Sequence, residues 1–362
     1  MAFPFTHPRP LPSEQPVLSS AVQNTITKAQ RSIERLNQLI ISFENPKVLI
    51  RPIMRKEAHS TSSIEGVNTP YEKLVSNSIQ DFENQEFLEV RNFMDTAEFA
   101  IDWVMIDKKL SLPFFERLHK ELFSGIKRWG ESIGKFRQVE VKIVNSDGYE
   151  FYPMKHGEEI NESLKGLLTW FNKTKDWDPI VAIACFHYYF EAIHPFEDGN
   201  GRIGRLLAIL QLREKNLLDF PILDISTWLK NKTHLYQLGF QKVTLDNEWE
   251  THIGIMAAAI RGAADELIIE IKRLEELHKA ERAKVKQAFR SHSRATDVLD
   301  FALEAPEFTV PQLSEELGIS FKSANALVAK LVDIGSLVSI GDSRYDRRFK
   351  NHALYEYAKN GF

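Results

Sequence analysis

The segment 194–205, His-Pro-Phe-Glu-Asp-Gly-Asn-Gly-Arg-Ile-Gly-Arg, constrains the fold of this chain more than any other part of it. It follows an apolar, helix-compatible run at 181–193. Pro195 disfavours the α conformation for His194, so we expect the helix to end there and the histidine to lie on a turn. A second helix is expected to begin at Arg202. The glycines before it let successive amide N–H groups converge, and the helix N-terminus points further N–H groups at the same place.

The side chains of this segment predict an anion site with a base and a metal ligand beside it. His194 supplies an imidazole, which titrates close to neutral pH and suits a general base. Asp198 supplies a carboxylate, the kind of ligand that Mg²⁺ uses together with phosphate oxygens. Arg202 and Arg205 are three residues apart and so share one helix face. Each feature alone is typical of an ordinary turn, but their combination favours a phosphate-binding function.

Composition places the chain among globular proteins. Its 362 residues, 43% hydrophobic and 27% charged, suggest two or three domains. The net charge of −4 gives no global reason to expect nucleic acid as a partner. The single cysteine, Cys185, excludes an internal disulfide framework and lies in an apolar run typical of a buried thiol. The chain lacks the pattern of a signal peptide and any run long enough to span a bilayer, so we expect a cytoplasmic protein without a membrane partner.

Helical periodicity dominates the chain before and after one short interruption. The expected helices are 24–43, 48–65, 86–105, 112–123, 157–174, 179–193, 202–215, 226–243 and 249–280. The interruption is an alternation of apolar and polar residues at 139–144, followed by turn residues at 145–148 and a return at 149–152. This pattern predicts a β-hairpin, which serves either as an edge for an incoming extended peptide or as an inert surface ribbon.

The segment 292–362 is expected to form a separate small domain. Helices at 310–317 and 321–331, joined by a turn at Gly318, precede strands at 337–340 and 344–349, the order of a winged helix-turn-helix. Such a fold suggests DNA binding.

The charge of this domain does not favour a DNA duplex. It holds eight Lys and Arg against ten Asp and Glu, whereas duplex binders present a basic footprint. DNA therefore stays open as a partner, while dimerisation or docking of a protein is favoured. The locally basic residues are Arg344, Arg347, Arg348 and Lys350.

The pattern His194-Pro-Phe-x-Asp-Gly-Asn-Gly-Arg-x-x-Arg205 resembles the signature of the Fic family at every defined position. The likeness extends over about 50–245, and Gly134-Lys-Phe-Arg137 is similar to the start of the family's flap. The resemblance implies a mainly α fold, with a Fic helical core, a β-hairpin flap and a small C-terminal winged helix-turn-helix domain. The domains implied are an N-terminal helical region with an inhibitory motif at 1–108, the catalytic core at 109–255, a connecting helix at 256–291 and the winged-helix domain at 292–362.

Most Fic proteins that have been studied transfer AMP from ATP to a hydroxyl of a target protein. The resemblance therefore implies a protein adenylyltransferase with ATP as substrate, Mg²⁺ as cofactor, and as partner a target protein that presents a Ser, Thr or Tyr hydroxyl. Self-modification and a homodimer are compatible with this interpretation. The intact Gly199-Asn200-Gly201 favours AMP transfer over the phosphorylation found in relatives with lysine in place of Gly201, and it leaves UMP and GMP open.

The resemblance also assigns roles to single residues. His194 would be the general base, Asp198 would hold Mg²⁺, and Phe196 would be a packing anchor. Tyr236 is similar to a position near the base in some relatives, and an ordinary helix aromatic is an equal alternative. The implied nucleotide-binding residues are Gly199, Asn200, Gly201, Arg202, Ile203, Gly204, Arg205 and Tyr236, and the target-binding flap residues are Val141, Lys142, Ile143 and Val144.

The segment Thr61-Ser-Ser-Ile-Glu65-Gly66 resembles the family's inhibitory motif, Ser/Thr-x-x-x-Glu-Gly/Asn. By resemblance, Glu65 would pair with Arg205 and occupy the space of the γ-phosphate. A carboxylate there would remove a phosphate ligand and repel a polyphosphate. The alternative is a surface glutamate before a helix-ending glycine. Removal of AMP from targets, in which some relatives use this glutamate, also stays open.

Two other functions compete with the transferase. The first is a DNA-binding regulator whose Fic-like core only senses a nucleotide. The second is a metal-dependent hydrolase that uses His187, His194 and Asp198. The hydrolase is disfavoured because seven residues of helix separate the two histidines by about 10 Å along the axis.

Overall fold

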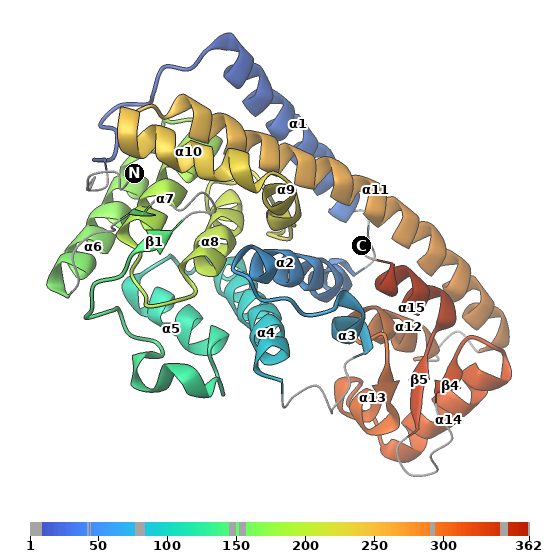
Figure 1. Ribbon diagram of the computed structural model, residues 1–362. Coiled ribbons are helices and arrows are strands. Elements are labelled where there is room, and N and C mark those ends of the chain that lie inside the picture. Colours follow the sequence, from blue (N-terminus) through green and yellow to red (C-terminus); the bar gives the residue numbers. More distant parts are fainter. Residues whose placement is uncertain are drawn as a thin grey trace.

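The computed structural model describes residues 9–41, 43, 45–76, 84–144, 150–151, 157–289, 294–340 and 347–360, and within them the chain is mainly helical (Figure 1). The predicted fold class is confirmed. The N-terminal elements are α1 (Ser20–Ile41), η1 (Pro46–Leu49), α2 (Ile50–Ile64), α3 (Tyr71–Ser76), α4 (Gln85–Met105), α5 (Leu112–Leu122) and η3 (Lys127–Ser132). The central elements are β1 (Ile143–Val144), β2 (Glu150–Phe151), α6 (Glu158–Lys173), α7 (Pro179–Ile193), α8 (Asn200–Glu214), α9 (Ile225–Asn231), α10 (Thr233–Asp246) and α11 (Glu250–Ala288).

The single helix predicted at 226–243 is wrong, because the chain forms two helices there. Lys232 leaves the helical region (φ −132°, ψ 37°) and separates α9 from α10. Helix α9 begins at its N-cap Asp224, which accepts from the backbone N–H of Thr227 at 3.0 Å, and it ends at Lys232. The two short helices can thus pack in different directions against α11.

Helices α7 and α8 form the centre of the molecule. Nearly all of α7 is apolar and buried, and α8 is buried from Asn200 to Leu212. A helix that is apolar on all sides must be enclosed by other elements; α6 and α11 pack on α7, and α2, α4, α5 and α9 pack on α8. The turn between α7 and α8 is therefore held from two rigid, buried helices.

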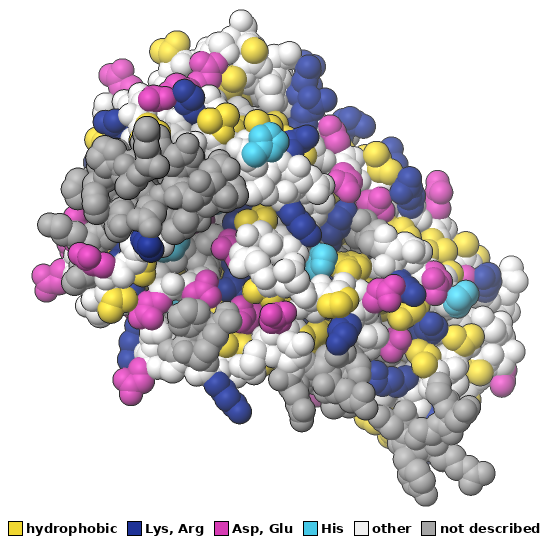
Figure 2. All heavy atoms as spheres, in the orientation of Figure 1, with side chains coloured by type: hydrophobic (Ala, Val, Ile, Leu, Met, Phe, Trp, Pro, Cys, Tyr) yellow, Lys and Arg dark blue, Asp and Glu magenta, His cyan; other side chains and the backbone are white. Residues whose placement is uncertain are grey.

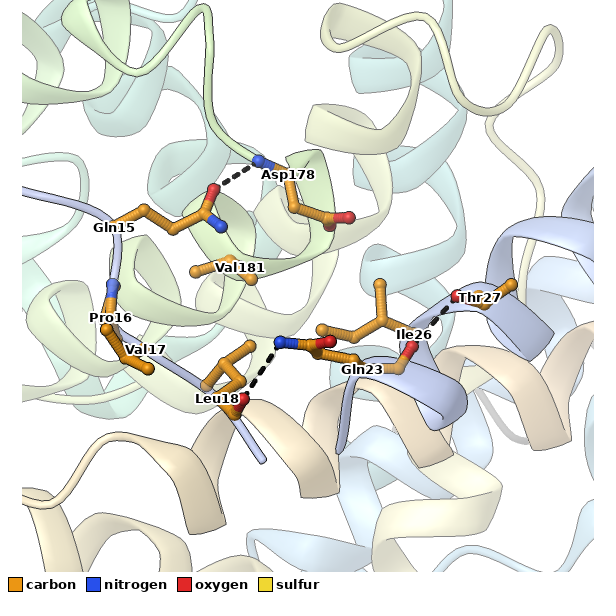
Figure 3. A pocket seen from close by; sticks show the side chains of 9 residues that line it. All are labelled: Gln15, Pro16, Val17, Leu18, Gln23, Ile26, Thr27, Asp178 and Val181. Atoms are coloured by element: carbon orange, nitrogen blue, oxygen red, sulfur yellow. Dashed lines mark hydrogen bonds between the residues drawn. The ribbon is translucent and has the colours of Figure 1, made fainter. Parts of the chain in front are cut away.

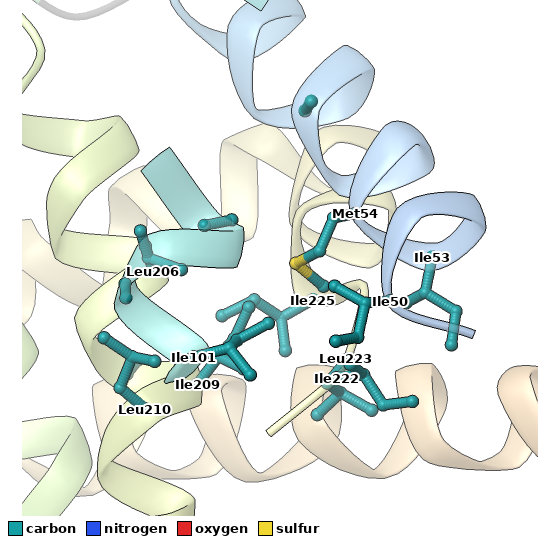
Figure 4. Packing of buried hydrophobic residues seen from close by; sticks show 14 of the residues in the cluster. Ile50, Ile53, Met54, Ile101, Leu206, Ile209, Leu210, Ile222, Leu223 and Ile225 are labelled. Atoms are coloured by element: carbon teal, nitrogen blue, oxygen red, sulfur yellow. The ribbon is translucent and has the colours of Figure 1, made fainter. Parts of the chain in front are cut away.

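Helix α2 is part of the same core. Figure 4 shows Ile50 and Met54 of α2 among Ile101 of α4, Leu206 of α8 and Ile225 of α9. These side chains are almost wholly removed from water, so α2 is anchored over its length by hydrophobic contact. Its last turn carries the segment 61–64 towards α8.

The predicted hairpin is present as a short antiparallel pair. Ile143 pairs with Phe151 and Val144 with Glu150, so the paired part is shorter than the alternation suggested. The turn predicted at 145–148 and the two ends of the return, at 149 and 152, lie outside the described residues.

The C-terminal part has the predicted order of helix, turn, helix and two strands. Its elements are α12 (Ala295–Glu304), β3 (Phe308–Thr309), α13 (Val310–Glu316), α14 (Phe321–Asp333), β4 (Val338–Ile340), β5 (Arg348–Lys350) and α15 (His352–Lys359). The sheet has the order β3-β5-β4, all antiparallel. Sequence patterning did not predict β3, because two residues directly before a helix carry no period.

The C-terminal part is docked on the rest of the chain at the far end of α11 (Figure 1). The guanidinium of Arg55 in α2 donates to the main-chain carbonyl of Glu304 at 2.8 Å. The hydroxyl of Tyr357 donates to the carbonyl of Glu270 in α11 at 2.8 Å, and Lys359 lies 3.4 Å from Glu72 of α3. Three elements outside the C-terminal part therefore hold it.

The surface carries charges of both signs. On the face in Figure 2, Lys and Arg side chains are interspersed with Asp and Glu side chains. Of the predicted basic cluster, Arg348 lies 3.7 Å from Glu307 and the Lys350 ammonium lies 3.7 Å from the centre of the Tyr355 ring. Arg344 lies outside the described residues. Within the described chain, every helix is too short or too polar to cross a bilayer.

Candidate active site

His194 lies at the turn after α7, as predicted. Its backbone is left-handed (φ 50°, ψ 62°), and its N–H donates to the carbonyl of Phe190 at 3.0 Å. The imidazole Nδ1 lies 3.3 Å from the carbonyl oxygen of Glu191. A carbonyl only accepts, so Nδ1 carries the hydrogen and Nε2 holds the lone pair of a neutral ring. Burial lowers the pKa of His194 to about 4, so the ring is neutral and able to take a proton near pH 7.

The loop after His194 is closed by Asn200. Its side-chain oxygen accepts from the N–H of Phe196 at 2.8 Å, and its side-chain nitrogen donates to the Phe196 carbonyl at 2.9 Å. Helix α8 begins at Asn200, two residues earlier than predicted, with Gly199 before it in a left-handed conformation (φ 79°). The first N–H groups of a helix have no partner within it. The closed loop thus presents the donor-rich start of α8 beside His194.

Phe196 is buried, as expected of a packing anchor, and it stacks on His119 of α5. The two ring centres lie 4.2 Å apart with an interplanar angle of 11°. His119 accepts the N–H of Gly134 on Nδ1 at 2.8 Å, and burial lowers its pKa to about 4. His119 was missed by sequence reasoning, because a lone histidine on an amphipathic helix carries no motif.

Arg137 ties the start of the hairpin to the histidine turn. Its guanidinium donates to the carbonyls of His194 at 2.7 Å, Ile193 at 3.2 Å and Val139 at 2.8 Å. Its own N–H donates to the carbonyl of Pro195 at 2.9 Å. The segment 134–137 was recognised in the sequence, but no role was given to Arg137. The structure makes it the link that positions the hairpin against His194.

Glu65 pairs with Arg205. The Arg205 NH2 group lies 2.6 Å from Glu65 Oε1, and the same guanidinium donates to the hydroxyl and carbonyl of Thr61 at 2.8 and 3.2 Å. Burial favours a raised pKa for Glu65, but the Arg205 charge and hydrogen bond outweigh it and hold that pKa below its ordinary value. Glu65 is therefore a carboxylate at neutral pH.

The Glu65 carboxylate also lies directly over the loop glycine. A Cβ placed on Gly201 would lie 2.2 Å from Glu65 Oε1 and 2.8 Å from Arg205 NH1. The carboxylate oxygen thus fills the space beside the first turn of α8, where a bound anion would meet backbone N–H groups. A carboxylate and a phosphate group cannot share that space.

Arg202 and Arg205 have different partners, although they share a helix face. Arg202 NH1 lies 2.8 Å from Glu89 Oε2 of α4, with both side chains buried. Arg202 NH2 lies 3.4 Å from Asp198, and the guanidinium lies 5.0 Å from the centre of the Phe123 ring. The pairing of Arg202 with Glu89 was not predicted, because Glu89 lies in a segment without a motif.

Asp198 fits the role of a magnesium ligand. Its side chain is 28% exposed at the start of α8, and Oδ1 accepts the N–H of Gly199 at 2.6 Å. Mg²⁺ in nucleotide sites commonly takes one or two carboxylates and completes its shell with phosphate and water. Among the described residues, no three metal-ligating side chains converge, so a metal here would depend on the nucleotide for further oxygens.

A family model of Fic/DOC proteins matches residues 109–212, and a model of the Fic/DOC N-terminal region matches residues 22–102. The chain belongs to the Fic/DOC family. The first match contains the whole site from His119 to Arg205, and the second contains Glu65. The family resemblance of the sequence is thereby confirmed.

Curated relatives match over short stretches. The probable protein adenylyltransferase aq_aa38 of Aquifex aeolicus is 41% identical over 56 residues, which is 16% of this chain and 18% of that protein. The protein adenylyltransferase fic-1 of Caenorhabditis elegans is 46% identical over 55 residues, 15% of this chain and 11% of its own length. This chain thus spans less than a fifth of the length of either relative.

Solved structures show the same fold over longer stretches. A Fic family protein from Desulfovibrio desulfuricans G20 superposes with a TM-score of 0.61 at 21% identity, covering 94% of this chain and 98% of that chain. A Fic domain containing signaling protein from Bacteroides thetaiotaomicron gives 0.54 at 18% identity, covering 67% of this chain and 95% of that one. At such identities the likeness shows the Fic fold and not the activity.

The remaining predicted nucleotide residues lie around Arg205. Ile203 is buried, and Gly204 lies in the first turn of α8. Tyr236 of α10 is buried, and its hydroxyl lies 2.7 Å from His187 Nε2. His187 is thus engaged with Tyr236, so the structure does not bring His187, His194 and Asp198 together as the hydrolase hypothesis requires.

The predicted flap residues follow Arg137 along the chain. Val141 is half-buried, Lys142 is exposed, and Ile143 and Val144 form β1. The edge that these residues offer to a target peptide stays a prediction.

A pocket of about 380 Å³ lies at the opposite end of α7 from His194 (Figure 3). The N-terminal arm at 15–18 covers it, together with residues of α1 and Asp178. The Asp178 carboxylate already accepts from the N–H of Ile180 at 2.9 Å and from the Gln30 side chain at 2.8 Å. The pocket therefore offers no base or nucleophile that competes with His194.

Proposed function

We propose that this Fic protein is a protein adenylyltransferase, which moves AMP from ATP to a Ser, Thr or Tyr hydroxyl of a target protein and is held inactive by Glu65. The observation that carries this proposal is the Glu65 carboxylate, bound to Arg205 and filling the space over Gly201. A carboxylate in that position fills the space in which a phosphate group of the nucleotide would bind. The names of the relatives from Aquifex aeolicus and Caenorhabditis elegans support AMP as the transferred group.

The turn at His194 supplies the base that the proposed transfer uses. The target hydroxyl gives its proton to Nε2 of His194, while its oxygen attacks the α-phosphorus of ATP. The bond from the α-phosphorus to the bridging oxygen breaks, and pyrophosphate leaves with that electron pair. Glu191, through its main-chain carbonyl, keeps the hydrogen on Nδ1, so that Nε2 faces the hydroxyl as an acceptor.

The start of α8 would hold the phosphates through its N–H groups and Arg205. Asp198 would hold Mg²⁺, which when bound neutralises phosphate charge. Arg202, fixed by Glu89, keeps a positive charge at the base of the same loop. The hairpin, fixed to the turn by Arg137, would align the target backbone beside His194. Positioning and charge stabilisation of this kind dominate phosphoryl-type transfers.

Labelling by ATP tests the proposal. The full chain is incubated with Mg²⁺ and ATP labelled at the α- or at the γ-phosphate, as wild type, Glu65→Gly and Glu65→Gly/His194→Ala. We expect label from the α-position only. Glu65→Gly should raise self-labelling by about 10- to 100-fold, because a charge-assisted hydrogen bond of about 1.5–3 kcal/mol no longer holds Arg205. The double variant should lose transfer.

The control is Glu131→Gly, which removes an exposed glutamate in η3 and should leave labelling unchanged. Label from the γ-position alone would replace AMP transfer by kinase chemistry. Equal labelling by wild type and Glu65→Gly would contradict the inhibitory role of Glu65. Full transfer by the double variant would show that a different residue takes the proton.

A further inference from the structure

The carboxyl group of Glu191 lies against the start of α8 and is used by no step described above. Glu191 belongs to the last turn of α7, directly before His194. A Cβ placed on Gly204 would lie 2.3 Å from Glu191 Oε1, so the carboxyl packs on the backbone of the first α8 turn. This Oε1 is shielded from water and has no hydrogen-bond partner among the residues that the structure describes. A buried polar atom without a partner is costly and calls for a function.

Charged and titratable groups from three other helices face the Glu191 carboxyl. They are Arg205 of α8, Glu65 of α2 and Tyr236 of α10. Burial raises the pKa of Glu191 to about 8; the charge of Arg205 opposes this rise and the carboxylate of Glu65 adds to it. On α7 itself, the neutral ring of His194 is bound to the main-chain carbonyl of Glu191. The carboxyl therefore carries a proton near neutral pH.

We propose that Glu191 is a positioning residue that has to hold a proton whenever a nucleotide polyphosphate occupies the space now filled by the Glu65 carboxylate. The inference rests on the proposed function, since it takes that space as the phosphate site. A neutral Glu191 leaves the whole charge of Arg205 to the phosphate. An ionised Glu191 competes for the same guanidinium and repels the incoming anion.

Nucleotide binding is then linked to a proton. Glu65 helps to keep the proton on Glu191 in the inhibited protein, so removal of Glu65 lowers the pKa of Glu191. A polyphosphate in the same space restores a negative charge and raises that pKa again. Binding must therefore take up protons from solvent at pH values between the pKa of the free state and that of the bound state. In this range the affinity falls as the pH rises, by up to about tenfold per pH unit.

Calorimetry of ATP binding in buffers of different ionisation heat measures this proton uptake. The protein is the full chain with Glu65→Gly and His194→Ala, which frees the site and prevents transfer. Titrations with ATP and Mg²⁺ run from about pH 7 to about pH 9, above the second phosphate pKa of about 6. We expect an uptake that reaches at most about one proton and an affinity that declines with pH.

Adding Glu191→Gln should abolish both the uptake and the pH dependence while retaining affinity, because the amide is neutral at every pH. The matched control is Glu214→Gln at the far end of α8, where burial also raises the pKa of a carboxyl. That variant should keep the uptake.

Tight ATP binding without proton uptake in the Glu65→Gly/His194→Ala protein overturns the inference, and this result does not depend on how well the Glu191→Gln variant folds. Equal uptake with and without Glu191→Gln overturns it as well. Absence of any ATP binding instead contradicts the proposed function, and the inference with it. The two failures are distinguishable. If ATP binds without proton uptake, the inference fails and the proposed function stands; if ATP does not bind, both fail.

Discussion

At the residue scale, main-chain oxygens decide the chemistry of His194. The Glu191 carbonyl fixes its tautomer, and the left-handed backbone of His194 ends α7. Its own carbonyl is held by Arg137 from the hairpin. The sequence motif predicted the histidine and its turn from neighbouring residues. Arg137 could not be predicted in this role, because its contact spans 57 positions along the chain.

The lowered pKa of His194 predicts how the rate of AMP transfer depends on pH. The base form of a histidine is present above its pKa, and burial lowers this pKa to about 4. Loss of the Glu65 carboxylate lowers it further, because that charge favours the protonated ring. In the Glu65→Gly protein at saturating ATP, kcat for AMP transfer should therefore be flat between about pH 5.5 and pH 7 and show no step near 6.5, the ordinary histidine value. Initial rates in overlapping buffers measure it, and a tenfold fall below pH 6.5 would contradict the assignment.

At the element scale, α2 combines a packing role with the inhibitory role that we propose for Glu65. Its first half supplies core side chains such as Ile53 and Met54, and its last turn supplies Thr61 and the approach to Glu65. A buried glutamate, Glu57, joins it to α9. This carboxyl accepts from the N–H of Ser226 at 2.9 Å and from the Ser226 hydroxyl at 2.5 Å. The Glu65 carboxylate therefore follows a helix that the fold cannot release as a whole.

Two substitutions of Glu57 should show whether its hydrogen bonds or its charge contribute to the free energy of unfolding. Burial and the neighbouring Asp224 raise the pKa of Glu57 well above its ordinary value, which favours the neutral form of this carboxyl. Glu57→Gln keeps an acceptor for Ser226 and should cost less than about 1 kcal/mol, whereas Glu57→Ala leaves a buried N–H unpaired and should cost about 2–4 kcal/mol. Urea unfolding monitored by circular dichroism measures both. Equal losses for the two variants would show that Glu57 is ionised in the folded protein.

The helices and strands also show which elements the sequence pattern could predict. Helical periods predicted α1, α4, α5, α6 and α7 closely, because each has an apolar stripe or an apolar body. Patterning failed at Lys232, where the helix breaks without glycine or proline, and at β3, which is too short to have a period. The motif predicted the pairing of Glu65 with Arg205, and the structure has it. The pairing of Arg202 with Glu89 depends on packing between distant helices, which no local pattern encodes.

At the scale of the whole molecule, the C-terminal part is joined to α2. Arg55 of α2 is buried, and its NH2 group donates to the carbonyl of Glu304, the last residue of α12. Its Nε and NH1 have no hydrogen-bond partner within the described chain. The carbonyl end of a helix carries partial negative charge, which favours a cation there. The helix that precedes Glu65 is thus in direct contact with the docked α12.

Arg55→Ala should weaken this contact and partly relieve inhibition. Loss of one hydrogen bond of about 0.5–1.5 kcal/mol between α12 and α2 should raise self-labelling by about two- to tenfold and lower the melting temperature. In the Glu65→Gly background the same change should add nothing, because the inhibitory carboxylate is already gone. The matched control is Arg51→Ala, which removes another α2 arginine, whose ion pairs are with Glu98 and Asp95 of α4 at 2.7 and 3.9 Å. A similar rise with Arg51→Ala, or a lowered melting temperature without more labelling for Arg55→Ala, would mean that the C-terminal part stabilises the fold without controlling Glu65.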